Sequence, residues 1–183
     1  MLIESGELLA VMPNAGKRIP AFLLPLNDAM FEFGITSGER MAAFLAQIAH
    51  ESGELRYVRE LATGSAYEGR ADLGNTEPGD GIKFRGRGLI QLTGRFNVQA
   101  ISDFFGIDFV DDPSLLETPE WACRSAGWFW GMNKLNILAD HNDEEHFKLI
   151  TKRINGGLNG WADRLKYWNR ARRVLGVDLS SSS

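Results

Sequence analysis

Two glutamates nine residues apart, Glu51 and Glu60, have types and spacing that suit acid–base chemistry. Met41, Phe44 and Ile48 form an apolar stripe at helical spacing that leads to Glu51, so this carboxyl is expected at the edge of a buried helix face. Partial burial raises the pKa of a carboxyl, and the negative end of the helix macrodipole acts in the same direction. A carboxyl that keeps its proton near neutral pH can serve as a general acid.

The second carboxyl can join the first only if the helix stops between them. On one straight helix, nine residues separate two positions by ~13.5 Å and place them on opposite faces. Gly53 is predicted to end the helix, so that the chain turns back and brings Glu60 opposite Glu51. Taken alone, the pattern also fits a partly solvated glutamate at the end of a helix.

Helical periodicity covers most of the chain and predicts the elements that position these residues. The helix with Glu51 is predicted to begin at a capping box of Thr36 and Glu39. Residues 61–88 lack a period and are punctuated by glycines, which is typical of a long functional loop. The fold class is mainly α, with that loop and with or without a small β-hairpin. Further predictions are helices over 20–33, 93–105, 118–132, 143–154 and 161–175, short strands near 82–84 and 89–92, a helix cap at Thr93, and inward side chains at Phe96, Ala100, Ile101 and Phe104.

The composition is that of an ordinary globular domain. The chain has 183 residues, 44% of them hydrophobic and 24% charged, which is enough for one core. Its net charge of −4 argues against nucleic acid as a partner. Glu4 and Glu7 stand where a signal peptide would carry basic residues, and the apolar run 19–26 is too short to span a bilayer. Cys123 is the only cysteine, so the chain cannot form an internal disulfide.

Three segments in this order resemble glycoside hydrolase family 19, which has a lysozyme-like fold. They are AHESG at 49–53, FRGRGLIQLTG at 84–94 and INGG at 154–157, the last followed by GWADRLKYW. The resemblance covers roughly residues 20–175 and is closer to the phage and prophage endolysin branch of the family. The wording typical of that branch is YEGRADLGNT and GDGIKFRGRGLIQLTGR.

The resemblance implies a role for each matching residue. Glu51 matches the general acid that protonates the glycosidic oxygen, and Glu60 matches the general base that activates a water. Leu89 replaces a proline common in plant chitinases, which speaks mildly against chitin as the substrate. The remaining matches are Thr93, which helps to hold the water, and the substrate-binding positions Gln91, Asn155, Arg164 and His50, the last an orienting neighbour of the acid.

Family members invert the anomeric carbon, and inversion needs room for a water between the sugar and the base. The two carboxyls are therefore expected ~6.5–9.5 Å apart, rather than the ~5–5.5 Å of a retaining enzyme. This chemistry needs no cofactor.

Other motifs are weaker. The GRG at 86–88 lacks the lysine and the strand–helix context of a phosphate-binding loop. His141 and His146 are five residues apart with no third ligand recognised in the sequence, so no metal site is predicted. The basic residues of the last helix are interpreted as a solvated face, with anionic cell wall or lipid as a weaker alternative.

We therefore expect a monomeric endolysin that hydrolyses β-1,4 bonds of bacterial peptidoglycan for host lysis. It would accumulate in the host cytoplasm, have no stable membrane insertion, and reach the cell wall through a separate pore. A chitinase, a catalytically inactive glycan-binding domain, and an effector delivered between bacteria are the alternatives. The predicted organisation is an N-terminal arm at 1–19, a catalytic domain at 20–176 and a frayed tail at 177–183.

Overall fold

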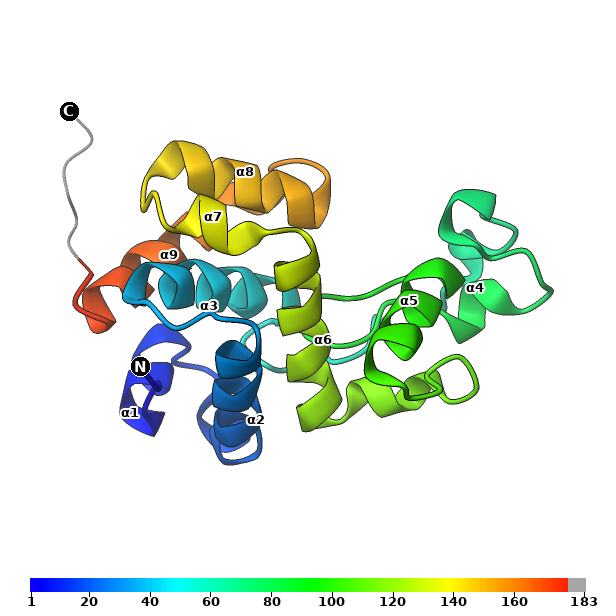
Figure 1. Ribbon diagram of the computed structural model, residues 1–183, viewed down its shortest axis with the longest axis horizontal. Coiled ribbons are helices and arrows are strands. Elements are labelled where there is room, and N and C mark those ends of the chain that lie inside the picture. The colour runs from blue at the N-terminus through cyan, green and yellow to red at the C-terminus, as the bar shows by residue number, and fades with distance from the viewer. Residues whose placement is uncertain (178–183) are drawn as a thin grey trace.

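The fold is mainly helical, as predicted, and the computed structural model describes residues 1–177. Figure 1 shows a larger body gathered around α3 and a smaller lobe that carries α4 and α5, with α6 at their junction. The body and the lobe each contain a cluster of buried apolar side chains. Most of the predicted tail, residues 178–183, lies outside the described residues.

The elements follow one another as short and medium-length helices joined by turns. No helix within residues 1–177 is long and apolar enough to cross a membrane. The α-helices are α1 (Ser5–Val11), α2 (Ile19–Glu32), α3 (Gly38–Ser52), α4 (Asp80–Lys83), α5 (Arg95–Phe105), α6 (Pro119–Met132), α7 (Leu135–Ala139), α8 (Glu144–Asn155) and α9 (Trp161–Val174), and the 3₁₀ helices are η1 (Gly16–Arg18), η2 (Ser65–Tyr67), η3 (Ala71–Leu73) and η4 (Pro113–Glu117).

Helix α3 forms the centre of the body. The predicted stripe of Met41, Phe44 and Ile48 is confirmed, because all three side chains are fully buried. The helix packs along α9, while α2 packs on α6 and α1 packs on α9 and α2. Burial on all sides fixes the position of the α3 C-terminus, where Glu51 lies.

The predicted start of α3 is wrong by one residue. Ser37, not Thr36, is the N-cap, and its hydroxyl accepts a hydrogen bond from the Arg40 backbone N–H at 3.3 Å. A β-carbon at Gly38 would lie 2.7 Å from the side chain of Val177, so the close approach of the distant C-terminal segment favours glycine as the first helical residue. No local pattern carries that contact.

The predicted strands are also wrong within the described chain, which contains isolated β-bridges but no sheet. Residues 80–83 form the single turn α4, because Asp80 accepts the Glu77 N–H and pairs with Arg95 at 2.6 Å. Residues 89–92 form a buried turn instead of a strand, since Gly88 and Gln91 both have positive φ. The only pairing in this region joins Arg87 to residues 59 and 92.

Helix α5 differs from its prediction at its start and on its faces. The predicted cap at Thr93 is wrong, because the N-cap is the next residue, Gly94. Its φ of 92° is a conformation that disfavours residues with a side chain, such as threonine. Phe96 and Phe104 are 62% and 53% exposed, and Ala100 is also exposed, so these three predictions of inward side chains are wrong. Ile101 is buried as predicted. The inward face includes Ser102, whose hydroxyl is satisfied by the Val98 carbonyl and the Phe109 N–H.

Two other predicted helix starts are confirmed. The side chain of Thr118 accepts from the Trp121 N–H at the start of α6, and that of Asp143 accepts from the His146 N–H at the start of α8. Helices α8 and α9 follow one another through residues 156–160, which bring the start of α9 against the end of α3.

Candidate active site

Glu51 lies in the last turn of α3 and is held by a buried arginine. The Arg164 Nη2 atom is 2.5 Å from Glu51 Oε1, and the arginine side chain is 0% exposed against 16% for the glutamate. The remaining guanidinium donors bind Gln47 Oε1 at 2.6 Å and the Asn159 carbonyl at 3.0 Å. The guanidinium therefore fixes the position of the Glu51 carboxyl at the end of α3. The helical spacing around Glu51 does not predict its pair with Arg164.

His50 is fixed on the neighbouring face of the same turn. Its Nδ1 is 2.8 Å from Asp163 Oδ2, at the start of α9. A β-carbon at residue 160 would lie 2.1 Å from the imidazole Cε1, so Gly160 allows the chain to pass directly over the ring. His50 therefore ties the end of α3 to the start of α9.

Asn155 ends α8 on the same side of the body. Its Oδ1 atom is buried and has no hydrogen-bond partner, which leaves one unused acceptor. Thr151, one turn earlier on α8, accepts a hydrogen bond from Gln47 Nε2 at 2.8 Å, and Gln47 in turn binds Arg164. This chain of polar contacts connects α8 to the arginine that holds Glu51.

The helix break that the pairing requires is confirmed. Gly53 is the C-cap of α3 in the left-handed conformation, with a φ of 56°. The chain then reverses and runs beside residues 86–88, where the Glu60 N–H donates to the Gly86 carbonyl at 2.9 Å and the Gly88 N–H donates to the Val58 carbonyl at 2.8 Å. This pairing fixes the backbone of Glu60.

The Glu60 carboxylate is half-buried and accepts one hydrogen bond at each oxygen. The Tyr67 hydroxyl donates to Oε1 at 3.0 Å, and the Gly86 N–H donates to Oε2 at 3.2 Å. Burial, followed by the bond to Glu60, raises the pKa of Tyr67, so this phenol keeps its proton as a donor. Sequence reasoning missed Tyr67, because it lies in the aperiodic loop and no spacing connects it to Glu60.

Gln91 and Thr93 meet Glu60 at Gly86. A β-carbon at residue 86 would lie 3.0 Å from Gln91 Oε1 and 3.2 Å from Thr93 Oγ1. Thr93 Oγ1 donates to the Gln91 carbonyl at 2.9 Å, and Gln91 Nε2 donates to the Gly88 carbonyl at 3.0 Å. Three of the predicted site residues, Glu60, Gln91 and Thr93, therefore lie around Gly86. The only sequence signal for this glycine was its place in the GRG segment.

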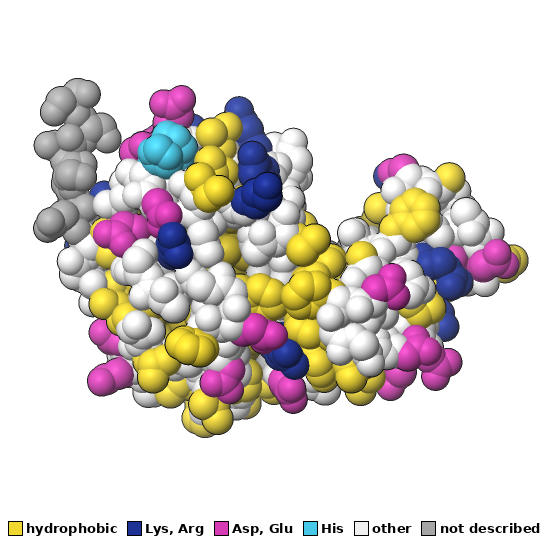
Figure 2. Space-filling view, viewed as in Figure 1, with side chains coloured by type: hydrophobic (Ala, Val, Ile, Leu, Met, Phe, Trp, Pro, Cys, Tyr) yellow, Lys and Arg dark blue, Asp and Glu magenta, His cyan; other side chains and the backbone are white. Residues whose placement is uncertain are grey.

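The predicted site residues form two groups. His50, Glu51, Asn155 and Arg164 belong to the body, and Glu60, Gln91 and Thr93 belong to the segments that lead into the lobe. Figure 2 shows a notch in the surface between the body and the lobe. Figure 1, drawn from the same side, places the end of α8 in the body and α4 and α5 in the lobe. A site that uses both carboxyls would therefore lie where the body meets the lobe.

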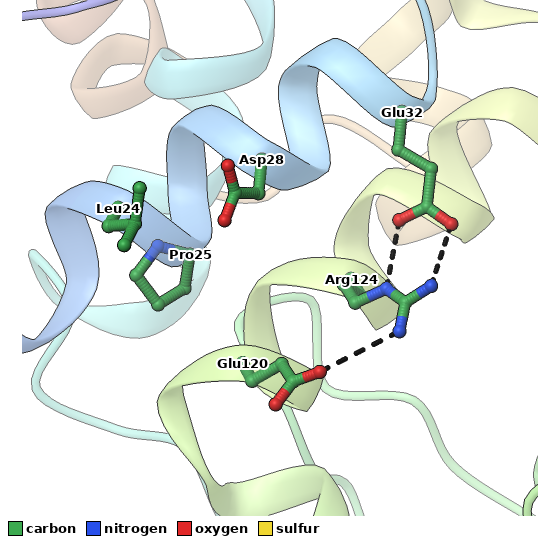
Figure 3. Close-up of a pocket in the computed structure, with 6 residues that line it drawn as sticks. All are labelled: Leu24, Pro25, Asp28, Glu32, Glu120 and Arg124. Carbon is green, nitrogen blue, oxygen red and sulfur yellow. Dashed lines mark hydrogen bonds and ion pairs between the residues drawn. The ribbon is translucent and has the colours of Figure 1, made fainter.

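A separate pocket of about 390 Å³ lies between α2 and α6 (Figure 3). Arg124 binds both oxygens of Glu32 at 2.8 Å and lies 3.7 Å from Glu120. Two of the pocket's three acidic side chains, Glu32 and Glu120, are thus engaged by one arginine that joins the two helices. This arrangement is better suited to holding α2 on α6 than to acid–base chemistry.

The two histidines set aside in the sequence do acquire a third neighbour. Asp143 Oδ1 lies 2.8 Å from His146 Nδ1, and the rings of His141 and His146 stack with centroids 3.7 Å apart at 4°. The expectation that nothing clusters with them is therefore wrong. A metal lies in the plane of each imidazole that binds it, and two parallel stacked rings cannot share one ion in that way. The contact between Asp143 and His146 belongs to the N-cap of α8.

Comparisons with known proteins agree on one family. The family model for glycoside hydrolase family 19, described as chitinase class I, matches residues 27–144. A Haemophilus influenzae protein described as containing a family 19 domain is 31% identical over 97% of this chain and 99% of its own length. An endochitinase of Arabidopsis thaliana is 33% identical over 79% of this chain. The chain spans 50% of the length of that relative.

Solved structures have the same fold. A bacterial family 19 chitinase superposes with a TM-score of 0.78 at 24% identity, covering 100% of this chain and 98% of its own. Chitinase C from Streptomyces griseus superposes with a TM-score of 0.77 at 24% identity, covering 98% of this chain and 79% of its own. The matched range and the shared fold include the end of α3, the turn after it and the glycine-rich loop.

Proposed function

Since the chain belongs to glycoside hydrolase family 19, we propose that it cuts β-1,4 bonds between N-acetylated sugars with Glu51 as general acid and Glu60 as general base. The observation that supports this best is the difference between the two carboxyl environments. Glu51 is paired with a buried arginine, whereas Glu60 accepts only neutral donors, a phenol and a backbone N–H. Glu51 thus has a fixed positive charge beside it that can stabilise the carboxylate formed when it gives up its proton, and Glu60 is oriented by neutral donors.

In the proposed reaction Glu51 gives its proton to the glycosidic oxygen as the bond from that oxygen to the anomeric carbon breaks. Glu60 takes a proton from a water whose oxygen attacks the anomeric carbon from the opposite face, which inverts its configuration. The water supplies the hydroxyl of one product, and the proton from Glu51 completes the other. Exchange with solvent then returns a proton to Glu51 and removes one from Glu60.

Arg164 has a specific part in this scheme. Glu51 becomes negatively charged as it gives up its proton, and the guanidinium 2.5 Å away stabilises that charge as it forms. Since three acceptors hold the guanidinium in place, it needs no reorganisation during the reaction. Thr93 and Gln91 are proposed to hold the attacking water and the substrate beside Glu60. Asn155 is proposed to bind an N-acetyl group, as the family resemblance implies.

We propose bacterial peptidoglycan as the polymer, with chitin as the second candidate. The likeness of residues 67–76 and 79–95 to the endolysin branch favours peptidoglycan. The chitinase names of the plant relatives and of the similar structures favour chitin. If the chain cuts peptidoglycan, the identity of the sugar at the new reducing end distinguishes a muramidase from a glucosaminidase.

The decisive experiment compares both polymers with one preparation. The purified chain is incubated with peptidoglycan sacculi and with chitin oligosaccharides, and the products are read by mass spectrometry. New reducing ends from sacculi at a rate at least comparable with chitin support the proposal. Turnover of chitin alone would favour the chitinase, and glycan binding without turnover would favour an inactive glycan-binding domain.

An endolysin role adds a cellular proposal. The chain would act as a monomer that accumulates in the host cytoplasm and meets the cell wall once a separate pore opens. Expression in a bacterial cytoplasm with and without a pore-forming protein tests this, and lysis that depends on the pore is the expected result. Equal lysis without the pore would contradict it.

A further inference from the structure

Glu54 is a buried carboxylate that the proposed chemistry does not use. The residue is 5% exposed, although it lies only three positions after Glu51. Its oxygens accept hydrogen bonds from the Asn14 backbone N–H at 2.5 Å, the Asn14 side chain at 3.0 Å and the Tyr167 hydroxyl at 2.6 Å. Burial of a carboxylate is unfavourable unless its oxygens are satisfied, and these three donors satisfy them.

The turn that carries Glu54 is strained. Gly53, Glu54 and Leu55 have φ values of 56°, 59° and 66°, so two residues with side chains follow a glycine in the left-handed region. That region is unfavourable for residues other than glycine, and such conformations persist only when the surroundings hold them. Leu55 is held by burial in the core at 1% exposure, and Glu54 is held by its hydrogen bonds.

This strained turn lies in the chain between the two proposed catalytic acids, Glu51 and Glu60. The Arg56 and Tyr57 N–H groups both donate to the Ser52 carbonyl, which closes the turn behind Glu54. A change in the turn would therefore move the segment that carries Glu60 relative to the end of α3. The distance available to the attacking water depends on that placement.

The donors to Glu54 come from two distant parts of the chain. Asn14 lies just before η1, and Arg18 in the same segment donates from Nε to the Glu54 carbonyl at 3.2 Å. Tyr167 lies on α9, one turn after Arg164, which holds Glu51. The N-terminal segment and α9 therefore meet at the turn between the acids.

We propose that Glu54 is a positioning residue that sets the relative placement of Glu51 and Glu60 by holding this turn through Asn14 and Tyr167. The inference rests on the proposed glycan hydrolysis. It makes residues 14–18 part of the machinery that orients the acids, although they lie outside the family match at 27–144. Glu54 itself does not touch substrate in this account.

The test uses Glu54→Gln and the milder Tyr167→Phe in the full chain. Glu54→Gln keeps the size but replaces one acceptor oxygen with an amide, and Tyr167→Phe removes one donor. A misplacement of reacting groups by about 1 Å costs on the order of 100-fold in rate, so we expect kcat to fall by about 10- to 100-fold. We expect KM on the same glycan to change by less than about threefold, because the groups that bind sugar are untouched.

Asn27→Ala is the matched control. Asn27 is 8% exposed and binds both the N–H and the carbonyl of Ile3, so it also anchors the N-terminal segment, but away from the turn. The control should lose thermal stability and keep the kcat of the unmutated chain at a temperature where all variants are folded. The split between kcat and KM in the Glu54 and Tyr167 variants, but not in the control, is the expected result.

The failures are distinguishable. If the unmutated chain turns over glycan and the Glu54 and Tyr167 variants keep its kcat while folded, the positioning role is wrong and the proposed function stands. If Glu54→Gln does not fold, Tyr167→Phe decides alone by the same split. If the unmutated chain turns over neither polymer, the proposed function fails and this inference falls with it.

Discussion

Replacement of Arg164 should show how strongly the buried ion pair holds the end of α3. Arg164→Met would leave Glu51 Oε1, Gln47 Oε1 and the Asn159 carbonyl without their donors. Removing one partner of a buried hydrogen-bonded pair costs about 3–5 kcal/mol, because the groups left behind stay desolvated and unpaired. In a chain of this size each kcal/mol lowers the melting temperature by about 2–4 °C, so we expect a loss of about 6–20 °C.

A double-mutant cycle separates the pair from the rest of the site. In Arg164→Met with Glu51→Gln both partners of the pair are replaced, so the double variant should be more stable than the sum of the two single losses predicts. We expect a coupling of about 1–3 kcal/mol, measured by urea unfolding at neutral pH. Arg124→Met is the control, because its pair with Glu32 is more exposed, at 27% and 34%, and should cost about 1 kcal/mol or less. Single losses that add to within about 0.5 kcal/mol would refute the argument that Arg164 and Glu51 stabilise one another.

Three further predictions concern the lobe side of the site. Tyr67→Phe removes a donor to the Glu60 carboxylate and should lower kcat by about 10-fold or more, since hydrogen bonds to charged groups contribute about 1.5–3 kcal/mol; an unchanged kcat would mean that this bond does not orient the base. The bond to Arg95 holds the pKa of Asp80 below its ordinary value, so its contribution to stability is present above about pH 4 and is lost as the pH falls through the lowered value. The stability gap between the unmutated chain and Asp80→Asn, followed by thermal melts from pH 7 to pH 2, should therefore narrow on acidification, and a gap independent of pH would contradict this. Gly86→Ala places a methyl group 3.0 Å and 3.2 Å from the side-chain oxygens of residues 91 and 93 and should reduce kcat about 10-fold or more with little change in the far-ultraviolet circular dichroism, whereas full activity would show that this approach is not needed.

Local patterns predicted the parts of the fold that depend on local physics. The stripe of Met41, Phe44 and Ile48, the break at Gly53 and the caps at Thr118 and Asp143 each depend on residues within one or two turns of one another. These features were enough to predict a mainly helical fold and the turn between the two glutamates. The family resemblance then supplied the remaining site residues, which lie far apart in the sequence.

The errors occurred where a distant segment decides the local structure. The start of α3 lies one residue after the predicted one, where Val177 lies against Gly38, and residues 80–83 are helical where Asp80 pairs with Arg95. Phe96 covers Gly74 on the surface of the lobe, although periodicity predicted that it faces inward. Such contacts leave no mark in the spacing of neighbouring residues.

The same reason explains what the sequence could not show about the site. Arg164 lies 113 residues after Glu51, so no local spacing predicts that its guanidinium holds that carboxyl. Tyr67 lies in a loop without any period, so nothing in the sequence assigns it to Glu60. The sequence could propose the two acids and Arg164 as site residues, whereas the contacts that hold each carboxyl could be found only in the folded chain.

The configuration of the first product tests the central claim most directly. Proton NMR recorded during the first minutes of hydrolysis of an N-acetylated oligosaccharide distinguishes the two anomers before mutarotation mixes them. We expect the α-anomer to appear first from the β-linked substrate, and we expect Glu51→Gln and Glu60→Gln each to abolish its formation while glycan binding persists. Initial release of the β-anomer, or full turnover by either variant, would contradict single-displacement catalysis by this pair.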